Sequence, residues 1–486
     1  MTASVVRISQ ALDISVRWAL LMSVVGLAVL AAAVAVAARL GVLPLAVGAL
    51  LIAFGGVICL RWPLLALAAF VALIPIEEVF LIDGVGTLSK FAGVAFAVTY
   101  GARRIGRLEL GVMPPAAWAF LLWAIASLGW AIDPTTSWAE LSTLLQLFII
   151  AILIADLVVQ QPTVVRPVLW IYSLSAAATA FVGVLTFIGF GPGADARAAA
   201  IQGQNPAQFA AVLLPALVFG TYEALERERR ALGAAIALLT TAGIIVSGTR
   251  GAWLSIAVVV AIFVLPRLEF RRQVAAVGLM LVIGVATLQI PGVTQLLADR
   301  AGTAVTTGGS GRTDIWSVGA TIYWAHPVFG VGYANFPVAY TSDVVAASNV
   351  TFGFAQGQGI GPHNVAIGTL IELGPIGLLT LTLFLLPLVL RRGWGPDAAT
   401  VQAALASLLV LALFLDIVGN RKQVWLIIGL AAGLAYIKRK RRPERVDEEV
   451  GTPAMFAGPA HLPNGLVPIG SSDSPMPWVH PDRVRD

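Results

Sequence analysis

The chain has 486 residues, of which 58% are hydrophobic and only 12% are charged, and its formal net charge is +5. Its mean hydropathy is +0.88, and its apolar runs repeatedly reach about 20 residues, the length that a helix needs to cross a bilayer. Composition therefore predicts an all-α, polytopic transmembrane helical bundle. It argues against a transmembrane β-barrel, whose segments alternate in hydrophobicity over about 10 residues. Cys59 is the only cysteine, so an intramolecular disulfide is excluded.

Apolar runs bounded by charge, proline or glycine predict the membrane spans. The first run, Trp18 to Ala38, is too long for the core of a signal peptide, and we expect it to remain as a helix. About 12 to 14 spans are expected in total. They should begin near Trp18, Val42, Pro63, Leu88, Pro114, Leu141, Pro167, Pro206, Ala231, Gly251, Val274, Asn364, Thr400 and Gln423.

Clusters of basic residues predict the orientation of the bundle. With the N-terminus in the cytoplasm, all of these clusters fall on the cytoplasmic side, as the positive-inside rule requires. They are Arg103, Arg104 and Arg107; Arg227, Arg229 and Arg230; Arg267, Arg271 and Arg272; Arg391 and Arg392; and the run KRKRRPER after Ile437. The few cations on the outer side include Arg197, Arg250 and Arg312, which are either functional residues or ordinary loop residues paired with a nearby aspartate. Both termini are expected in the cytoplasm.

Composition also divides the chain into domains. We expect a membrane domain over residues 1–442, with a long extracytoplasmic loop at residues 291–363 that contains short helices. From Pro443 the sequence turns to proline, glycine, serine and scattered charge, which predicts a disordered cytoplasmic tail at residues 443–486. The sequence has neither an internal repeat nor the inverted pair of broken helices that marks many transporters.

Two of the outer-side arginines lie next to predicted helix ends. Arg197 precedes a span that opens at Asn205 and a proline, and this asparagine is typical of a helix cap, whereas the arginine has no such explanation. Arg250 lies in the polar break IIVSGTRGAWLSI. A tight turn, with Gly248 and Gly251 supplying backbone freedom, accounts for the glycines. It does not account for an arginine, which would be desolvated and rigid there, as a phosphate ligand should be.

The third arginine belongs to the segment SGRTDIWSVGATIYWAHPVFGVG. Apolar residues from Ile315 onward recur at helical spacing, which predicts an amphipathic helix at the membrane interface, with aromatic anchors such as Trp316. We expect Thr313 to cap this helix and Arg312 to lie at its N-terminus. A helix N-terminus beside a guanidinium favours an anion.

The segment GPHNVAIGTLIELGPIGLL returns the loop to the membrane. His363 precedes a membrane helix that Asn364 is expected to cap. Imidazole titrates near neutral pH, so His363 is a candidate general base, although a lone histidine is more often structural. Glu372 should lie roughly 13 Å further along the helix, buried as a functional carboxylate or as a packing partner.

The remaining motifs do not indicate a cofactor. The sequence has no histidine and cysteine spacing of a metal site, no D-x-D pair and no nucleotide-binding loop. We therefore predict a chain that uses neither a metal nor another cofactor and that does not bind nucleic acid.

Four motifs follow one another between residues 197 and 433. They consist of Arg197 and Asn205; Ser247, Gly248, Thr249, Arg250 and Gly251; Gly311, Arg312, Trp316, Pro327, Gly330 and Gly332; and His363, Asn364, Glu372, Leu373 and Gly374. This ordered set resembles the O-antigen ligase and polymerase family of bacterial membrane glycosyltransferases. The resemblance implies transfer of a glycan from a polyprenyl (undecaprenyl) pyrophosphate carrier to a sugar hydroxyl. This transfer takes place without metal, at the outer face of the cytoplasmic (inner) membrane, in surface polysaccharide biosynthesis.

The resemblance also implies roles for individual residues. Arg197, Arg250 and Arg312 would bind the pyrophosphate, since guanidinium groups can stabilise a leaving group by bidentate hydrogen bonds in a low-dielectric cleft. His363 would take the proton of the acceptor hydroxyl, and we count Arg250 and Arg312 with it as catalytic. Glu372, Asn364 and Trp316 are supporting candidates. The partners would be the lipid-linked glycan donor, a glycan or lipid-glycan acceptor and membrane lipid.

Other functions remain open at this stage. The main alternative is a multi-pass transporter or flippase of a lipid-linked or small substrate, for which broken helices and charges at the membrane midplane are expected. A lipid II polymerase of the shape and division type and a structural scaffold are further alternatives. The motifs do not separate ligases from repeat-unit polymerases.

Overall fold

The computed structural model describes residues 61–77, 81–82, 86–190, 205–226, 229–261, 265, 269–306, 311–351, 360–391 and 393–450. The spans expected near Trp18 and Val42, the candidate Arg197 and the tail after residue 450 lie outside these residues. The chain divides into two units, Met1–Lys440 and Arg441–Asp486. The site and the networks described below belong to the first unit.

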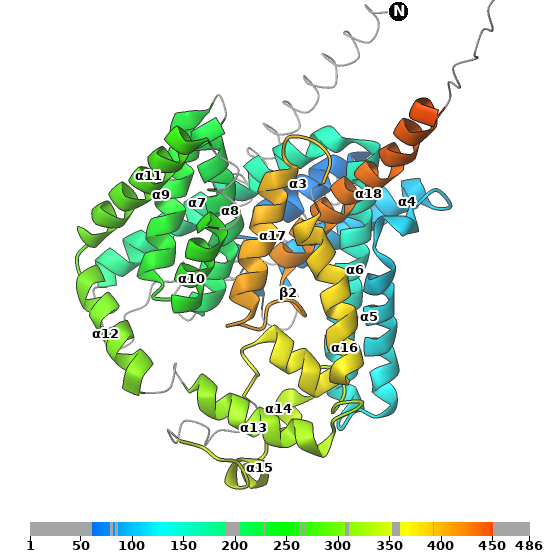
Figure 1. Ribbon diagram of the computed structural model, residues 1–486, viewed down its shortest axis with the longest axis vertical. Helices are drawn as coiled ribbons and strands as arrows, with labels where there is room; N and C mark the ends of the chain where they lie inside the picture. The colour runs from blue at the N-terminus through cyan, green and yellow to red at the C-terminus, as the bar shows by residue number, and fades with distance from the viewer. Residues whose placement is uncertain are drawn as a thin grey trace, which may run out of the picture. The chain divides into compact units, whose positions relative to one another are not determined.

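The described residues are almost entirely helical, which confirms the all-α part of the predicted fold class (Figure 1). The longer helices are α3 (Pro63–Leu73), α4 (Leu88–Arg104), α5 (Pro115–Ala126), α6 (Pro134–Gln160), α7 (Val165–Phe190), α8 (Pro206–Glu226), α9 (Arg230–Val246), α10 (Arg250–Val259), α11 (Phe270–Leu288), α12 (Val293–Thr306), α13 (Arg312–Ala325), α16 (Val365–Leu390), α17 (Ala398–Ala412) and α18 (Lys422–Val450). The short elements are α14 (Phe336–Ala339), α15 (Ser342–Ala346), the 3₁₀ turns η2 (Leu110–Val112), η3 (Ser127–Gly129) and η4 (Pro162–Val164), and the antiparallel pair β1 (Leu81–Ile82) and β2 (Gly86–Thr87). Helix α18 continues past the domain boundary expected at residue 442.

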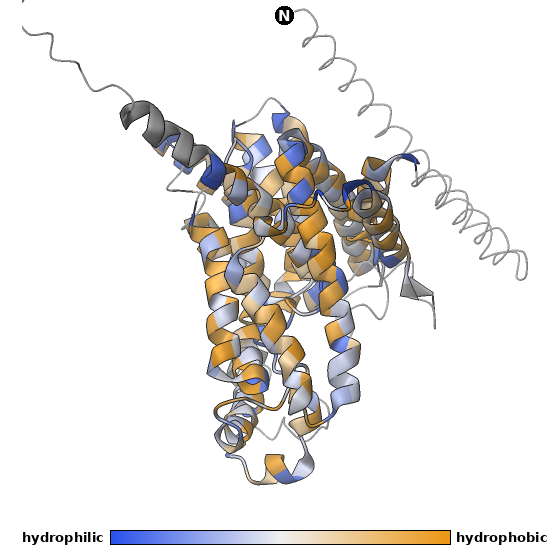
Figure 2. Ribbon diagram, turned by 90° about the vertical axis from the view of Figure 1, so that its right-hand side faces the viewer, coloured by the Kyte–Doolittle hydropathy of each residue, from blue (hydrophilic) through white to orange (hydrophobic). Residues whose placement is uncertain are grey.

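Four helices of the described part are long and apolar enough to cross a bilayer, namely α6, α7, α8 and α16. The helices α3, α5, α9 and α17 are apolar but shorter. Apolar residues make up most of these helices (Figure 2). Some of them are exposed, such as Leu383 of α16, whose exposed fraction is 52%. Such surfaces face lipid in an integral membrane protein.

Small residues let the central helices approach closely. Gly429 and Gly433 of α18 face α6, where an added Cβ would lie 2.9 Å from the Ala151 carbonyl oxygen and 2.8 Å from the Ala155 carbonyl oxygen. Two glycines one turn apart allow backbone contact between membrane helices, where dispersion replaces the hydrophobic effect as the driving force. Helix α6 therefore lies in direct backbone contact with α18.

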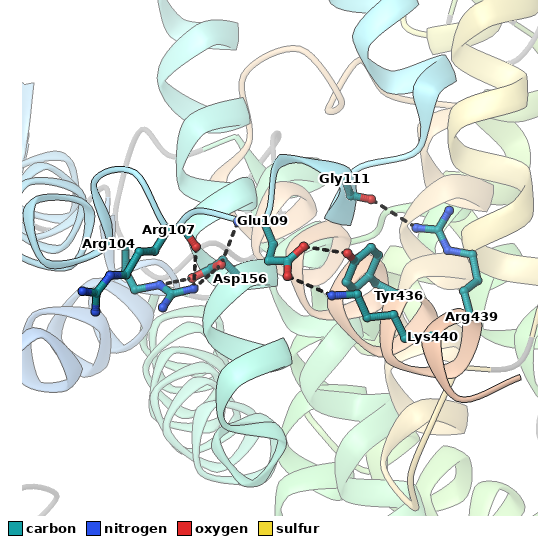
Figure 3. Close-up of polar contacts among 8 residues, drawn as sticks. All are labelled: Arg104, Arg107, Glu109, Gly111, Asp156, Tyr436, Arg439 and Lys440. Atoms are coloured by element: carbon teal, nitrogen blue, oxygen red, sulfur yellow. Dashed lines mark hydrogen bonds and ion pairs between the residues drawn. The ribbon is translucent and has the colours of Figure 1, made fainter. Parts of the chain in front are cut away.

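A polar network surrounds the end of α6 that lies near η2 and α18. Asp156 is fully buried, and its carboxylate accepts hydrogen bonds from Tyr100 Oη (2.6 Å), Arg104 Nε (2.9 Å) and the Glu109 amide (3.1 Å). Glu109 in turn accepts hydrogen bonds from two side chains of α18, and Figure 3 shows this chain of contacts from Arg104 to Lys440. We call these residues, together with Tyr436, the Asp156 network. It joins α4, η2, α6 and α18.

We expect Asp156→Asn to lower the stability of the bundle. The substitution keeps the size of the side chain but leaves Arg104 without its carboxylate, and breaking a buried ion pair costs about 3–5 kcal/mol. Thermal unfolding in detergent should show a lower midpoint. Asp343→Asn, at an exposed position of α15, is the matched control and should leave the midpoint unchanged. An unchanged midpoint for Asp156→Asn would show that the network does not stabilise the fold.

Candidate functional site

The segment between α13 and α14, residues 326–335, packs onto a break in α16, and we call it the docked segment. Gly374 has φ 67° and ψ −173°, so α16 is interrupted just before Pro375. The amide of Val331 donates to the Ile371 carbonyl (3.0 Å), and the amide of Gly332 donates to the Glu372 carbonyl (2.8 Å). The docked segment thus satisfies carbonyl groups that a continuous helix would have satisfied itself.

Two motifs of the sequence are the two halves of this contact. An added Cβ at Gly330 would lie 2.5 Å from the Glu372 carbonyl group, and one at Gly374 would lie 2.1 Å from the Val328 oxygen. Both glycines also have positive φ, a conformation that disfavours other residues. Glu372 belongs to the same contact, because its Oε1 accepts the Phe336 amide at 3.2 Å. This position gives Glu372 a structural contact, which fits the packing alternative.

The docked segment also binds the start of α6 through a residue that the sequence analysis missed. Asn335 is fully buried. Its Oδ1 accepts the Asp133 amide (2.6 Å) and its Nδ2 donates to Ser137 Oγ (2.6 Å). Ser137 Oγ donates to the Tyr333 carbonyl (2.7 Å). A polar asparagine three residues after the Gly-x-Gly turn was the available signal, but its partners lie about 200 residues away in sequence.

Arg312 begins α13, as expected, but the predicted cap is wrong. The N-cap is Gly311, whose φ of 75° is left-handed, and Thr313 lies within the first turn of the helix. Glycine reaches this conformation at no steric cost, so no side-chain cap is needed to start the helix. Arg312 Nη2 donates to the Phe414 carbonyl at the end of α17 (3.0 Å). Burial, and after it the charge of Arg250, lower the pKa of Arg312 from its usual value.

The break before α10 places Arg250 near the same point. Arg250 Nη1 donates to the Arg300 carbonyl (3.0 Å). Gly248 has φ 62°, as a tight turn requires. Gly251, however, does not supply backbone freedom: it is the second residue of α10, and an added Cβ would lie 2.8 Å from Phe414 Cβ. Its role is close approach to the residue whose carbonyl binds Arg312.

Arg300 of α12 is a further cation of this group. Its Nε is buried and has no hydrogen-bond partner among the described residues. The sequence analysis did not select Arg300 as a site residue, although it is one of the few outer-side cations. We call Arg250, Arg300 and Arg312 the arginine group. The fourth candidate, Arg197, lies outside the described residues.

His363 has a left-handed backbone, with φ 48°, which is unusual for a residue other than glycine. Both neighbours hold it. The Pro362 carbonyl accepts Trp316 Nε1 (3.1 Å), and Asn364 Oδ1 accepts the amides of the first turn of α16, which confirms the predicted cap. Asn364 Nδ2 also donates to the Leu413 carbonyl (2.9 Å), beside the acceptor of Arg312. Backbone strain of this kind persists only where the surroundings enforce it.

The electrostatics of His363 suit a base. Burial, and after it the charge of Arg312, lower the pKa of His363 from 6.5. The imidazole is therefore neutral at neutral pH and can accept a proton. The charge of Arg312 thus helps to keep the nearby histidine unprotonated.

A cavity of about 260 Å³ opens beside this group of residues. Carboxylates and hydroxyl groups supply much of its polar lining, namely those of Glu140, Glu372, Asp416, Tyr333, Thr136 and Thr369. Gly361 and Pro362, directly before His363, form part of its wall. The site thus has a cationic part and an acidic part.

Comparison with known proteins bears on this arrangement. A family model described as O-antigen ligase matches residues 235–382. No curated protein matches the chain. The matched range contains the whole polar break at Arg250, the start of α13 with Arg312, the docked segment, His363 and the break in α16. The match over residues 235–382 supports the O-antigen ligase and polymerase family, which the ordered motifs predict.

Proposed function

We propose that the protein is a metal-independent glycosyltransferase. It moves a glycan from a polyprenyl pyrophosphate carrier to a sugar hydroxyl at the outer face of the cytoplasmic membrane. The family match supports a glycosyltransferase-like role in surface polysaccharide synthesis. One observation carries the proposal: Arg312 bonds the Phe414 carbonyl, and Gly251, the residue after Arg250, packs against the same Phe414. The charge of Arg312 also lowers the pKa of His363.

The arginine group, with Arg197, would hold the pyrophosphate. Arg312 is partly buried and its pKa is lowered mainly by burial, so it lies where water screens charge poorly and ionic hydrogen bonds are strong. Pyrophosphate gains negative charge as it leaves, and fixed guanidinium groups stabilise that charge without reorganising. Several guanidinium groups in one place repel one another when the site is empty, which favours binding of a multivalent anion.

His363 would act as the general base. The acceptor hydroxyl oxygen attacks the anomeric carbon of the donor glycan, and its proton passes to the neutral imidazole. The bond between that carbon and the pyrophosphate oxygen breaks, and the carrier pyrophosphate keeps the electron pair. Trp316 and Asn364 would act as positioning residues, because they fix the backbone on either side of His363.

A transporter of a lipid-linked or small substrate is the second candidate, and the break in α16 favours it, because transporters use discontinuous helices. In this protein the docked segment occupies the freed carbonyls of Ile371 and Glu372, so these groups do not line a substrate path. Movement of a fluorescent lipid-linked donor across proteoliposomes, without glycan transfer, would establish transport in place of the transferase.

The proposed orientation places the arginine group outside and the Asp156 network inside the cell, within a membrane domain of about 12 to 14 spans. After Cys59→Ser, the exposed positions Ser342 and Lys438 can be changed to cysteine. A membrane-impermeant maleimide should label the variant at position 342 in intact cells and the variant at position 438 only after lysis. The reverse pattern would contradict the proposal, because the lipid-linked donor would then lie on the wrong side.

Turnover should survive removal of metal ions, because the arginine group takes the place of a divalent cation at the pyrophosphate. Purified full-length protein with a lipid-linked donor should transfer glycan in excess EDTA at the same rate as without it. A loss of transfer that magnesium or manganese restores would show that the reaction needs a metal.

Substitutions of Arg312 and of His363 should change donor affinity and rate in different ways. Arg312→Lys keeps a charge but loses the planar fork, so donor affinity and rate should both fall. His363→Asn tolerates the left-handed backbone but cannot serve as the base. It should leave donor affinity intact and lower the rate about 10²- to 10⁴-fold.

The pH dependence of the wild type tests the same role of His363. Because its pKa is lowered from 6.5, the rate of transfer should not change until the pH falls below 6.5.

Matched controls separate these effects from misfolding. Arg272→Lys on α11 and His326→Ala after α13 change the same residue types at exposed positions, and both should behave as the wild type. Donor affinity, turnover and the thermal midpoint are measured for all four variants. Normal turnover of His363→Asn would exclude His363 as the base.

A further inference from the structure

The polar lining of the acidic cavity comes from four separate parts of the fold. Thr136 and Glu140 come from the start of α6, Tyr333 from the docked segment, Glu372 from α16 and Asp416 from the α17–α18 connection. A volume of about 260 Å³ is below the about 300–1,000 Å³ of cavities for drug-sized ligands. The cavity therefore suits one ring-sized group and not a whole glycan repeat.

Two hydroxyl groups that line the cavity have no partner. Tyr333 is 8% exposed and Thr369 is 9% exposed, yet neither hydroxyl makes a hydrogen bond in the part of the chain that the structure describes. Comparable groups elsewhere do make one: Thr240 Oγ1 donates to the Ile236 carbonyl (2.7 Å), and Tyr172 Oη donates to the Val212 carbonyl (2.7 Å). Neither oxygen is among the fully buried polar atoms of the described residues that lack a partner, so both are open to the cavity, where a polar ligand can bond them.

The charges around the cavity define what that ligand can be. Burial, and after it the charges of Asp416, Glu372 and Glu140, raise the pKa of Tyr333. Burial, and after it the charge of Glu140, also raise the pKa of Asp416, while the charge of Arg421 opposes this shift. Both shifts arise because additional negative charge is unfavourable in this cavity, so a ligand that brings a further negative charge is disfavoured. A ligand that hydrogen-bonds to these carboxyl and hydroxyl groups and carries no negative charge fits the cavity.

We propose that this cavity is the subsite for the terminal sugar of the acceptor, and that it takes a neutral or amino-bearing ring and excludes phosphorylated or carboxylated ones. The inference rests on the proposed function and deepens it. Gly361 and Pro362 form a wall of the cavity, and the next residue is the base. The acceptor therefore lies on the acidic side of His363 and the donor pyrophosphate on the side of the arginine group.

The hydroxyl groups are tested by Tyr333→Phe and Thr369→Val, which remove one oxygen each and keep the shape. Each should raise the KM for the acceptor about 3- to 10-fold, the value of one hydrogen bond, and leave the affinity for the donor unchanged. Tyr323→Phe on α13 and Thr382→Val on the exposed side of α16 are the matched controls. An unchanged KM for both cavity variants would overturn the proposal.

The charge preference is tested with monosaccharide probes. Purified full-length protein in detergent is titrated with galactosamine, galactose and galactose 6-phosphate by ligand-observed NMR. The first two should bind and the phosphate should not, and Glu140→Gln combined with Asp416→Asn should reduce this discrimination at least several-fold. Equal or tighter binding of the phosphate, or filling of the cavity by a divalent cation in place of a sugar, would overturn the assignment.

Inorganic pyrophosphate separates this inference from the function on which it rests. Pyrophosphate binding that Arg250→Ala weakens, together with no sugar binding, removes the acceptor subsite and leaves the transferase intact. Pyrophosphate binding that does not depend on Arg250 refutes the proposed donor site, whatever the sugars do.

Discussion

The structure depends on the backbone carbonyls that the break in α16 exposes. Buried carbonyl groups rarely remain unsatisfied, because each one without a partner costs about 1–3 kcal/mol. The amides of Val331 and Gly332 satisfy two of them, and this requirement holds the docked segment in one register. Asn335 then ties the same segment to the start of α6. Hydrogen bonds therefore fix the register of the segment, and an apolar cluster that includes Val331, Phe336 and Ile371 packs it against α16.

The docked segment and the end of α17 together position Arg312 and the residues on either side of His363. The docked segment follows α13 directly, so its register constrains the helix that carries Arg312 and Trp316. The end of α17 supplies the second constraint, because its consecutive carbonyls of Leu413 and Phe414 bind Asn364 and Arg312. Arg312 is therefore held in place before any ligand binds, both by its position in α13 and by its hydrogen bond to Phe414. Such preorganisation is what electrostatic catalysis requires.

Sequence reasoning succeeded where the signal is local. The all-α class follows from long apolar runs, and the cap at Asn364 follows from a single residue type before a helix. It failed where a tertiary contact decides. Thr313 was expected to cap α13 because threonine usually does, but a left-handed Gly311 starts the helix instead. The role of Gly251 depends on Phe414, which lies more than 160 residues away, and no pattern within one segment can reveal such a pair.

The fit between Gly330 and Gly374 has a consequence for how this protein can change over time. The backbone of α16 lies 2.5 Å from the point where a side chain at Gly330 would begin. The backbone of the docked segment lies 2.1 Å from the corresponding point at Gly374. A single methyl group on either side separates both segments, and no compensating change nearby can make room, because the obstacle is backbone. A side chain at either glycine would therefore disrupt the contact, whereas the side chains that line the cavity can change without moving the backbone.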